Sequence, residues 1–144
     1  MARKREYPLL PMVGAGALIY KGNSILLVKR NNEPNKGRWA LPGGVVKVGE
    51  GVEDATRREV KEEVGLEIRL EGLLDVLDDI HYDGKGRVMY HFVLVSYLAS
   101  PQGGKVKVNS ESEEYKWFSP TEVRSVFATD NTKKVVQRYL DRPR

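Results

Sequence analysis

Apolar residues in this chain come in short runs separated by turn residues. The runs at 12–20 and 24–30 flank Lys21-Gly22-Asn23, so together they predict a β-hairpin. Residues 87–99 are rich in β-branched and aromatic side chains and predict a long strand. Residues 66–77 predict another strand. The pattern therefore indicates a strand-rich protein.

The segments between these runs are more polar and carry turn signals. We expect 31–37 and 78–86 to be loops and 101–104 to be a turn. Residues 38–48 read as short extended pieces that Pro42-Gly43-Gly44 interrupts, and 105–118 as extended in parts. The sheet is thus expected to consist of well-defined strands with loops of moderate length between them.

Three segments predict helices. Residues 51–64 have helical length and no proline, and a last helix is expected over about 132–140. Ser119-Pro120-Thr121-Glu122 is a capping-box signature, so a short helix should follow it. Strands with one well-defined helix in mid-chain favour an α+β fold. The length of 144 residues favours a single domain over 1–144.

Composition excludes several classes of chemistry. There are no cysteines, which excludes disulfides, thiolate zinc sites and a cysteine nucleophile. No apolar run is long enough for a membrane span, and the N-terminus lacks the features of a signal peptide, so we expect a cytoplasmic protein. The net charge is +4, with basic residues at both ends. No nucleic-acid motif accompanies them, so we expect solvated tails and no nucleic-acid partner.

The helix at 52–64 carries an unusual cluster of acids. At about 100° per residue, Glu59, Glu62 and Glu63 share one arc, with Val60 and Val64 on the adjoining flank. No basic residue falls inside that arc, and Arg58 lies just beyond its edge. A solvated helix face is one interpretation. The other is a site for Mg²⁺ or Mn²⁺, which prefer oxygen ligands and would relieve the repulsion.

The loop before the helix favours the metal site. Gly43 and Gly44 would leave backbone groups open to a ligand and permit positive φ. A glycine-rich turn that leads directly to an acidic helix is a candidate for binding a metal and a diphosphate together.

These residues also follow a known pattern. Gly44, Glu50 and the run REVKEEVGL at 58–66 have the residue types and spacing of the Nudix box, and no fixed position is missing. The chain therefore resembles the Nudix hydrolases, more weakly also at WFSPTEV (117–123). The resemblance implies a mixed β-sheet packed between helices. It also implies hydrolysis, with Mg²⁺ or Mn²⁺, of a nucleoside diphosphate linked to another group.

The resemblance assigns roles by position. It makes Glu62 and Glu63 the principal metal ligands, Glu59 a metal ligand or the group that activates water, and Arg58 the residue that orients Glu59. The Gly43 carbonyl would be a further metal ligand.

Other box positions are expected to be structural. Glu50 resembles a glutamate that is often ion-paired, and Gly44 and Gly65 would allow tight turns at the two ends. Gly51 stands where many relatives have Ser or Thr, and glycine is an acceptable helix cap.

Many relatives add an acid from a later loop as a general base or ligand. Here NSESEEYKW offers Glu111, Glu113 and Glu114, and Glu114 is the first choice. A solvated charged loop is the alternative.

Candidates for substrate binding lie outside the box. Arg30 could bind a phosphate or be an ordinary arginine at a strand end. Trp39 could stack on a base or lie in the core. His81 could line the site, and Tyr82 stands near the spacing at which dinucleoside polyphosphate hydrolases carry a tyrosine.

The substrate stays open at this stage. The chain resembles the ADP-ribose pyrophosphatase-like group around HYDGKGRVMYHF, so ADP-ribose is the first choice. Dinucleoside polyphosphates and oxidised nucleoside triphosphates are alternatives. A ligand sensor without turnover is an alternative of another class, although sensors usually have a damaged box. Many relatives are dimers, so a homodimer is expected by analogy.

Overall fold

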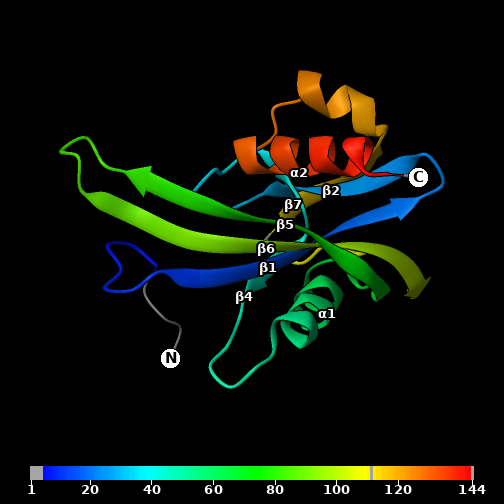
Figure 1. Ribbon diagram of the computed structural model, residues 1–144, viewed down its shortest axis with the longest axis horizontal. Coiled ribbons are helices and arrows are strands. Elements are labelled where there is room, and N and C mark those ends of the chain that lie inside the picture. Colours follow the sequence, from blue (N-terminus) through cyan, green and yellow to red (C-terminus); the bar gives the residue numbers. More distant parts are fainter. Residues whose placement is uncertain (1–4, 111, 144) are drawn as a thin grey trace.

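The computed structural model describes residues 5–110 and 112–143, without the side chain of residue 113. Its elements in chain order are β1 (Met12–Lys21), β2 (Ser24–Arg30), β3 (Trp39–Ala40), β4 (Gly43–Val45), α1 (Val52–Val64), β5 (Glu67–Tyr82), β6 (Val88–Gly103), β7 (Ser112–Phe118), the 3₁₀ helix η1 (Pro120–Ser125) and α2 (Asp130–Asp141). Seven strands form one sheet in the order β3-β2-β1-β6-β5, with β4 paired to β1 and β7 to β2. Figure 1 shows α1 on one side of this sheet and η1 with α2 on the other. The predicted mixed sheet between helices is confirmed.

The predicted hairpin is confirmed only at its turn. β1 and β2 pair antiparallel at Tyr20 with Ile25 and at Lys21 with Ser24. Over the rest of its length β1 pairs parallel with β6, from Met12 to Ile19. β1 has buried residues on both of its faces, which is typical of a central strand with neighbours on each side.

The strands β5 and β6 are longer than their side chains predict. β5 continues to Tyr82 and β6 to Gly103, so the predicted loop at 78–86 and turn at 101–104 are wrong in extent. Antiparallel pairing satisfies the backbone out to Tyr82 and Val88, even where the side chains are polar. Figure 1 shows the resulting hairpin projecting beyond the rest of the sheet.

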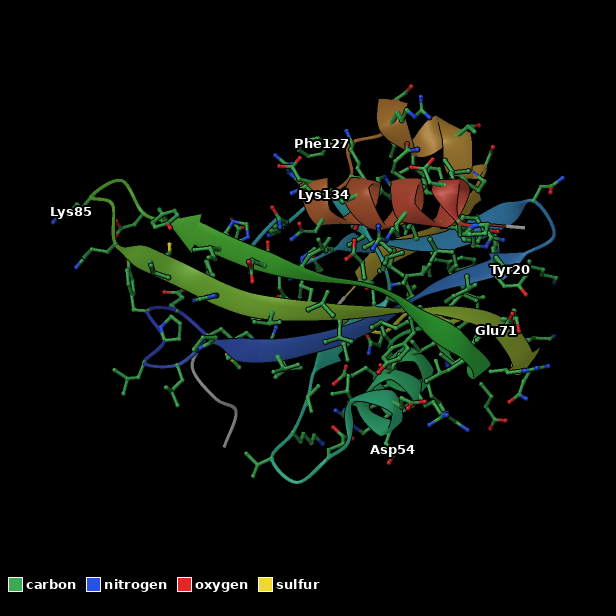
Figure 2. All side chains as sticks on the ribbon, viewed as in Figure 1. Tyr20, Asp54, Glu71, Lys85, Phe127 and Lys134 are labelled. Atoms are coloured by element: carbon green, nitrogen blue, oxygen red, sulfur yellow. The ribbon has the colours of Figure 1, made fainter. Side chains whose placement is uncertain are left out.

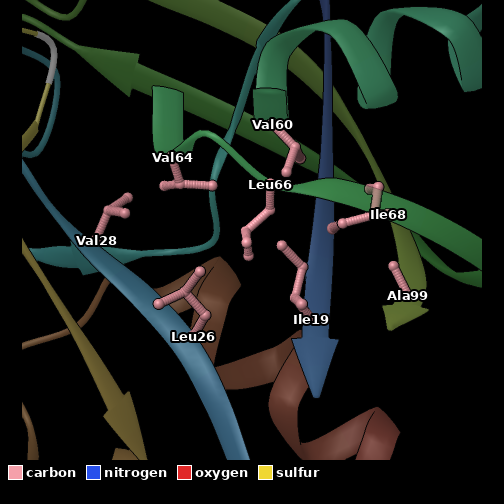
Figure 3. Packing of buried hydrophobic residues seen from close by; sticks show 9 residues of the cluster. Ile19, Leu26, Val28, Val60, Val64, Leu66, Ile68 and Ala99 are labelled. Atoms are coloured by element: carbon pink, nitrogen blue, oxygen red, sulfur yellow. The ribbon is translucent and has the colours of Figure 1, made fainter. Parts of the chain in front are cut away.

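Both faces of the sheet bury apolar residues. Figure 3 shows Val60 and Val64 of α1 directed at Leu66 and at the side chains of β1 and β2. A second cluster lies on the opposite face, where Leu27 packs with residues of α2. Among the described residues no helix is both long enough and apolar enough to cross a membrane.

Candidate active site

The acidic helix begins and ends where the sequence predicts. Gly51 is the N-cap in an extended conformation, and its carbonyl accepts a hydrogen bond from the Ala55 amide at 2.9 Å. Gly65 is the C-cap with φ of 75°, a left-handed conformation that favours glycine. Val60 and Val64 are fully buried, so they fix the rotation of α1. Glu59 and Glu63 consequently face β4, while Asp54 points away from the sheet (Figure 2).

The two glycines before the helix have a different role from the predicted one. Gly43 and Gly44 lie inside β4, paired with Gly16 and Ala15 of β1, and neither has a positive φ. The expectation of a tight turn at these glycines is therefore wrong. Gly44 instead provides space, because a Cβ there would overlap the Glu59 carboxylate. The missing side chain lets α1 approach the backbone of β4.

Glu63 is held at both of its carboxylate oxygens. Its side chain is buried, with the residue 7% exposed. Oε1 accepts the Gly43 amide at 3.0 Å, and Oε2 accepts the Ser112 hydroxyl at 3.0 Å. These two bonds, from β4 and β7, fix the direction of the carboxylate.

The side chain of Arg58 lies among the acids. Its Nε and Nη2 donate to the two oxygens of Glu50, at 2.6 and 2.9 Å. Its Nη1 donates to Glu59 at 2.7 Å and to Glu62 at 3.1 Å, and Nη2 also reaches the Val45 carbonyl at 3.2 Å. The backbone of Arg58 lies at the edge of the acidic arc, but its long side chain folds back along α1 to Glu59, the residue that it is expected to orient.

This network has a clear electrostatic consequence. The hydrogen bonds that Arg58 donates to Glu50 lower the pKa of Glu50 to about 2. The hydrogen bonds that Arg58 makes with Glu50 and Glu59 raise the pKa of Arg58. Both groups are therefore charged throughout the neutral range. The bidentate pair with Glu50 positions the guanidinium, and the guanidinium positions Glu59.

The acids suit a divalent metal in their chemistry and direction. The described residues include no preassembled group of three metal-ligating side chains. However, Glu59 and Glu62 converge on a single nitrogen of Arg58, so their carboxylates already share one cation. Carboxylate and backbone oxygens are the ligands that Mg²⁺ and Mn²⁺ prefer. The residues of this helix therefore fit such an ion.

A cavity of about 140 Å³ lies on the other side of β4. It is bounded by Gly43 and Gly44 of β4, by the β5 residue Asp79 and by the start of α2 at Asn131. Arg30, at the end of β2, also lines it, and its Nε donates to the Pro34 carbonyl at 2.8 Å. β4 thus separates the acidic helix from the cavity, and its glycines touch both.

Three of the four candidates for substrate binding do not line the cavity. Trp39 packs edge-on against Phe118, with ring centroids 5.0 Å apart, in the cluster around α2. This is the core alternative considered above.

Tyr82 is 64% exposed near the tip of the β5–β6 hairpin and is not among the residues that line the cavity. His81 lies in β5 with its Nε2 2.9 Å from Asp79 Oδ1, but it is not a lining residue either. Of the four, only Arg30 lines the cavity.

The structure does not bring Glu114 to the box. Its carboxylate lies 3.6 Å from the Lys29 amine. Lys116, two residues along β7, lies over the Phe118 ring, which packs toward α2. Glu114 shares the face of Lys116 and Phe118 and so points away from Glu63.

β7 presents Ser112 to the box instead. The irregular pairing of β7 with β2 between Lys29 and Arg30 is what puts Ser112, two residues before Glu114, on the opposite face. Ser112 is missed when only the acids of NSESEE are taken as candidates, because a hydroxyl that supports a carboxylate has no charge to mark it. Residue 111 and the side chain of residue 113 lie outside the described part of the chain.

Comparison with known proteins agrees with this arrangement. Residues 10–139 match the model of the NUDIX domain. An ADP-ribose pyrophosphatase of Methanocaldococcus jannaschii is 36% identical over 96% of this chain and 78% of its own length. Nucleoside triphosphatase NudI of Escherichia coli is 32% identical over 74% of this chain and 80% of its own. The crystal structure of a MutT NUDIX hydrolase from Burkholderia pseudomallei has 36% identity and a TM-score of 0.72, covering 90% of this chain and 98% of its own.

The chain therefore belongs to the NUDIX domain family. It is a Nudix hydrolase, an enzyme that acts on the phosphoric anhydride bond of nucleotide pyrophosphates.

Proposed function

We propose that this enzyme hydrolyses ADP-ribose to AMP and ribose 5-phosphate, with Mg²⁺ or Mn²⁺. The observation that carries the proposal is the position of β4, which has the box acids on one side and the cavity on the other. A diphosphate beside Gly43 and Gly44 would have its anhydride next to the acids and its nucleoside in the cavity. The relative named ADP-ribose pyrophosphatase, which aligns along 96% of this chain, supports the choice of substrate.

The residues have distinct roles in this reaction. Glu59, Glu62 and Glu63, with the Gly43 carbonyl, would hold the metal, which supplies positive charge that stabilises the phosphoryl oxygens and the leaving group. Arg58 orients Glu59, whose carboxylate is suited to accept a proton from the attacking water. The water oxygen bonds to one phosphorus as the bridging P–O bond breaks.

The residues outside the box divide into two groups. Arg30 is placed to bind a phosphate at the cavity wall. Trp39, Tyr82 and Glu114 have no part in the proposed reaction, because their contacts lie away from the cavity and the box.

A substrate panel with product identification tests the proposal. Purified protein with Mg²⁺ is given ADP-ribose, a dinucleoside polyphosphate, a nucleotide sugar and an oxidised triphosphate, and the products are separated by chromatography. We expect ADP-ribose to have the highest kcat/KM, with AMP as a product. A clear preference for a triphosphate would instead support the activity that the name NudI describes for that relative.

Metal binding has a readout that does not depend on turnover. Mg²⁺ at millimolar concentration should raise the melting temperature, because a ligand that binds only the folded state stabilises it. No rise would argue against a preformed metal site. A sensor would bind ADP-ribose without hydrolysing it.

A homodimer and a cytoplasmic location stay predictions. Light scattering after size-exclusion chromatography measures the molar mass in solution and so tests the homodimer.

A further inference from the structure

The segment before β1, residues 5–11, reaches the cavity, and we call it the strap. Arg5 of the strap lines the cavity together with Arg30, and it also lines a second, more open hollow beside Tyr90 of β6. Arg5 is exposed to solvent. The strap therefore brings an arginine to the cavity from a part of the chain that belongs neither to the box nor to the sheet.

Polar contacts with the β5–β6 hairpin hold the strap in place. The Tyr7 amide donates to the Met89 carbonyl at 2.8 Å, and the Tyr7 hydroxyl donates to Asp83 Oδ2 at 2.9 Å. The guanidinium of Arg87 lies 5.0 Å from the centroid of the Tyr7 ring, and its Nε donates to Asp83 at 2.9 Å. Figure 1 shows the strap beside the hairpin, ahead of β1. These contacts fix Tyr7, which is two residues after Arg5.

Burial contributes little to this anchoring. Leu9 and Leu10 of the strap are exposed, and Tyr7 itself is 41% exposed. Tyr7 also has a φ of 49°, a left-handed conformation that is uncommon for an aromatic residue and that surrounding contacts must hold in place. A few specific contacts therefore position the strap, and they can be removed without opening a hydrophobic core.

The guanidinium of Arg5 is available to an anion. Within the part of the chain that the structure describes, Arg5 makes no hydrogen bond and no ion pair. The two acids that border the second hollow have other partners. Glu6 accepts the Tyr90 hydroxyl at 3.4 Å, and Glu33 accepts the Lys36 amide at 3.0 Å. Arg5 is thus a charged donor near the cavity without a partner among the described residues.

The position of Arg5 suits the phosphates of a nucleotide. Among the described residues that line the cavity, only Arg5 and Arg30 are basic, and Gly43 and Gly44 of β4 line it as well. A guanidinium can form two parallel hydrogen bonds with a phosphate, and these are stronger than bonds between neutral groups. With a diphosphate beside β4, Arg5 would supply positive charge from the cavity side, whereas a metal would supply it from the α1 side.

We propose that the strap positions Arg5 to bind the diphosphate of the substrate, and that the contacts of Tyr7 with the hairpin keep the strap in this position. Arg5 binds substrate in this scheme, and Tyr7 is a positioning residue. The strap lies on the cavity side of β4, apart from the box acids, so it should affect KM more than kcat. The inference rests on the proposed function, because it concerns the substrate of the same site.

Arg5→Gln tests the contact with the diphosphate. We expect the KM for ADP-ribose to rise about tenfold and kcat to change less than about threefold, because one charged hydrogen-bonding group is lost from substrate binding. Lys85→Gln is the matched control. Lys85 is exposed in the hairpin loop, and its amide, which glutamine retains, donates to Asp83. The same loss of charge there should leave KM unchanged, and an unchanged KM in Arg5→Gln would overturn the inference.

Tyr7→Phe tests the anchor. The change keeps the ring beside Arg87 and removes the hydroxyl that donates to Asp83. We expect KM to rise about threefold, and not to rise further when Arg5→Gln is already present, because the anchor acts through Arg5. Independent effects of the two substitutions on KM would overturn the positioning role. Melting temperatures of all variants establish that the fold is retained.

Equilibrium binding to the metal-free protein separates this inference from the proposed function. ADP and adenosine differ by the diphosphate, so we expect Arg5→Gln to weaken ADP binding about tenfold and to leave adenosine binding unchanged. ADP binding should also depend less on salt in the variant. This result would support the inference even if ADP-ribose were not hydrolysed. An equal loss of affinity for both ligands, or no loss for either, would overturn it and leave the proposed function standing.

Discussion

The two sides of β4 are built on different principles. On the α1 side, four glutamates of the box surround Arg58 or bond to β4, and every one of them comes from residues 50–63. On the cavity side, apolar residues and a few polar groups come from β1, β2, β4, β5, β6 and α2. The first side is dense in charge and local in sequence. The second is mostly apolar and is assembled from distant segments.

This difference separates chemistry from recognition. The side that would hold the metal needs charges at fixed spacing, which a single helix supplies. The side that would recognise the nucleoside needs a shape and a few aligned polar groups, and these require several elements to meet. Substitutions on the two sides should therefore change different kinetic constants.

The largest effect is expected for Glu62→Gln. The change removes a carboxylate charge from the acid cluster but little packing, because Glu62 is half-exposed at 54% of its side chain. We expect kcat to fall by about 100-fold or more, with nearly unchanged melting temperature. Glu53→Gln, on the exposed face of the same helix, is the control and should behave like wild type. Activity of Glu62→Gln within a few-fold of wild type would contradict the assignment of the metal site.

Gly44→Ala tests β4, the strand that separates the acidic helix from the cavity. The added Cβ would overlap the Glu59 carboxylate and so displace it from Arg58. We expect a fall in kcat of about tenfold to 100-fold, as misplacement of a catalytic group by about 1 Å can cause.

Gly84→Ala is the control for that substitution, since a Cβ at Gly84 meets nothing within 4 Å. Equal activity of Gly44→Ala and wild type would show that Glu59 has another position from which it can act.

Two neighbouring leucines of β2 allow the α1 side of the sheet to be compared directly with the α2 side, where the cavity lies. Leu26 and Leu27 are both fully buried, but Leu26 packs with α1 and Leu27 with α2. Either change to Ala should lower the free energy of unfolding by about 2–5 kcal/mol, measured by denaturant titration.

Their kinetic effects should differ. Leu26→Ala should mainly lower kcat by several-fold, because it loosens the support of α1. Leu27→Ala should mainly raise KM, because it loosens the cavity side. The same pattern in both variants would mean that the two sides are not independent.

The smallest effect concerns pH. The pKa of Glu50 is about 2 in the folded protein, against an ordinary value of 4.5. Its pairing with Arg58 therefore stabilises the fold above pH 4.5, and this contribution is lost as the pH falls from 4.5 toward 2.

Melting temperatures measured from pH 6 to pH 3 provide the check. The melting temperature of Glu50→Gln should be lower than that of wild type at neutral pH, and the difference should shrink in acid. Glu53→Gln should follow wild type throughout. A constant difference between Glu50→Gln and wild type would contradict the assigned pairing.

The sequence predicted the α1 side well because its order is local. The spacing of Glu59, Glu62 and Glu63 on one helix, the apolar flank of Val60 and Val64 and the helix ends at Gly51 and Gly65 all follow from helical geometry. The mixed sheet between helices followed from the resemblance of that same segment to the Nudix box.

Contacts across the sheet could not be predicted in this way. The parallel pairing of β1 with β6 joins segments about eighty residues apart, and no local signal distinguishes it from the predicted hairpin. The opposite directions of Ser112 and Glu114 depend on the irregular pairing of β7 with β2 between Lys29 and Arg30, because in a regular strand residues two apart share a face.

By itself, the sequence determined that this protein carries a complete Nudix box with Glu59, Glu62 and Glu63 on one helix, because charge spacing along a helix is set by the backbone. Only the tertiary structure decided that Ser112 of β7 reaches Glu63, that Gly44 of β4 makes room for Glu59, and that Asp79 meets Asn131 at the cavity. Those three contacts depend on how far elements approach one another, and packing across the whole sheet sets that distance.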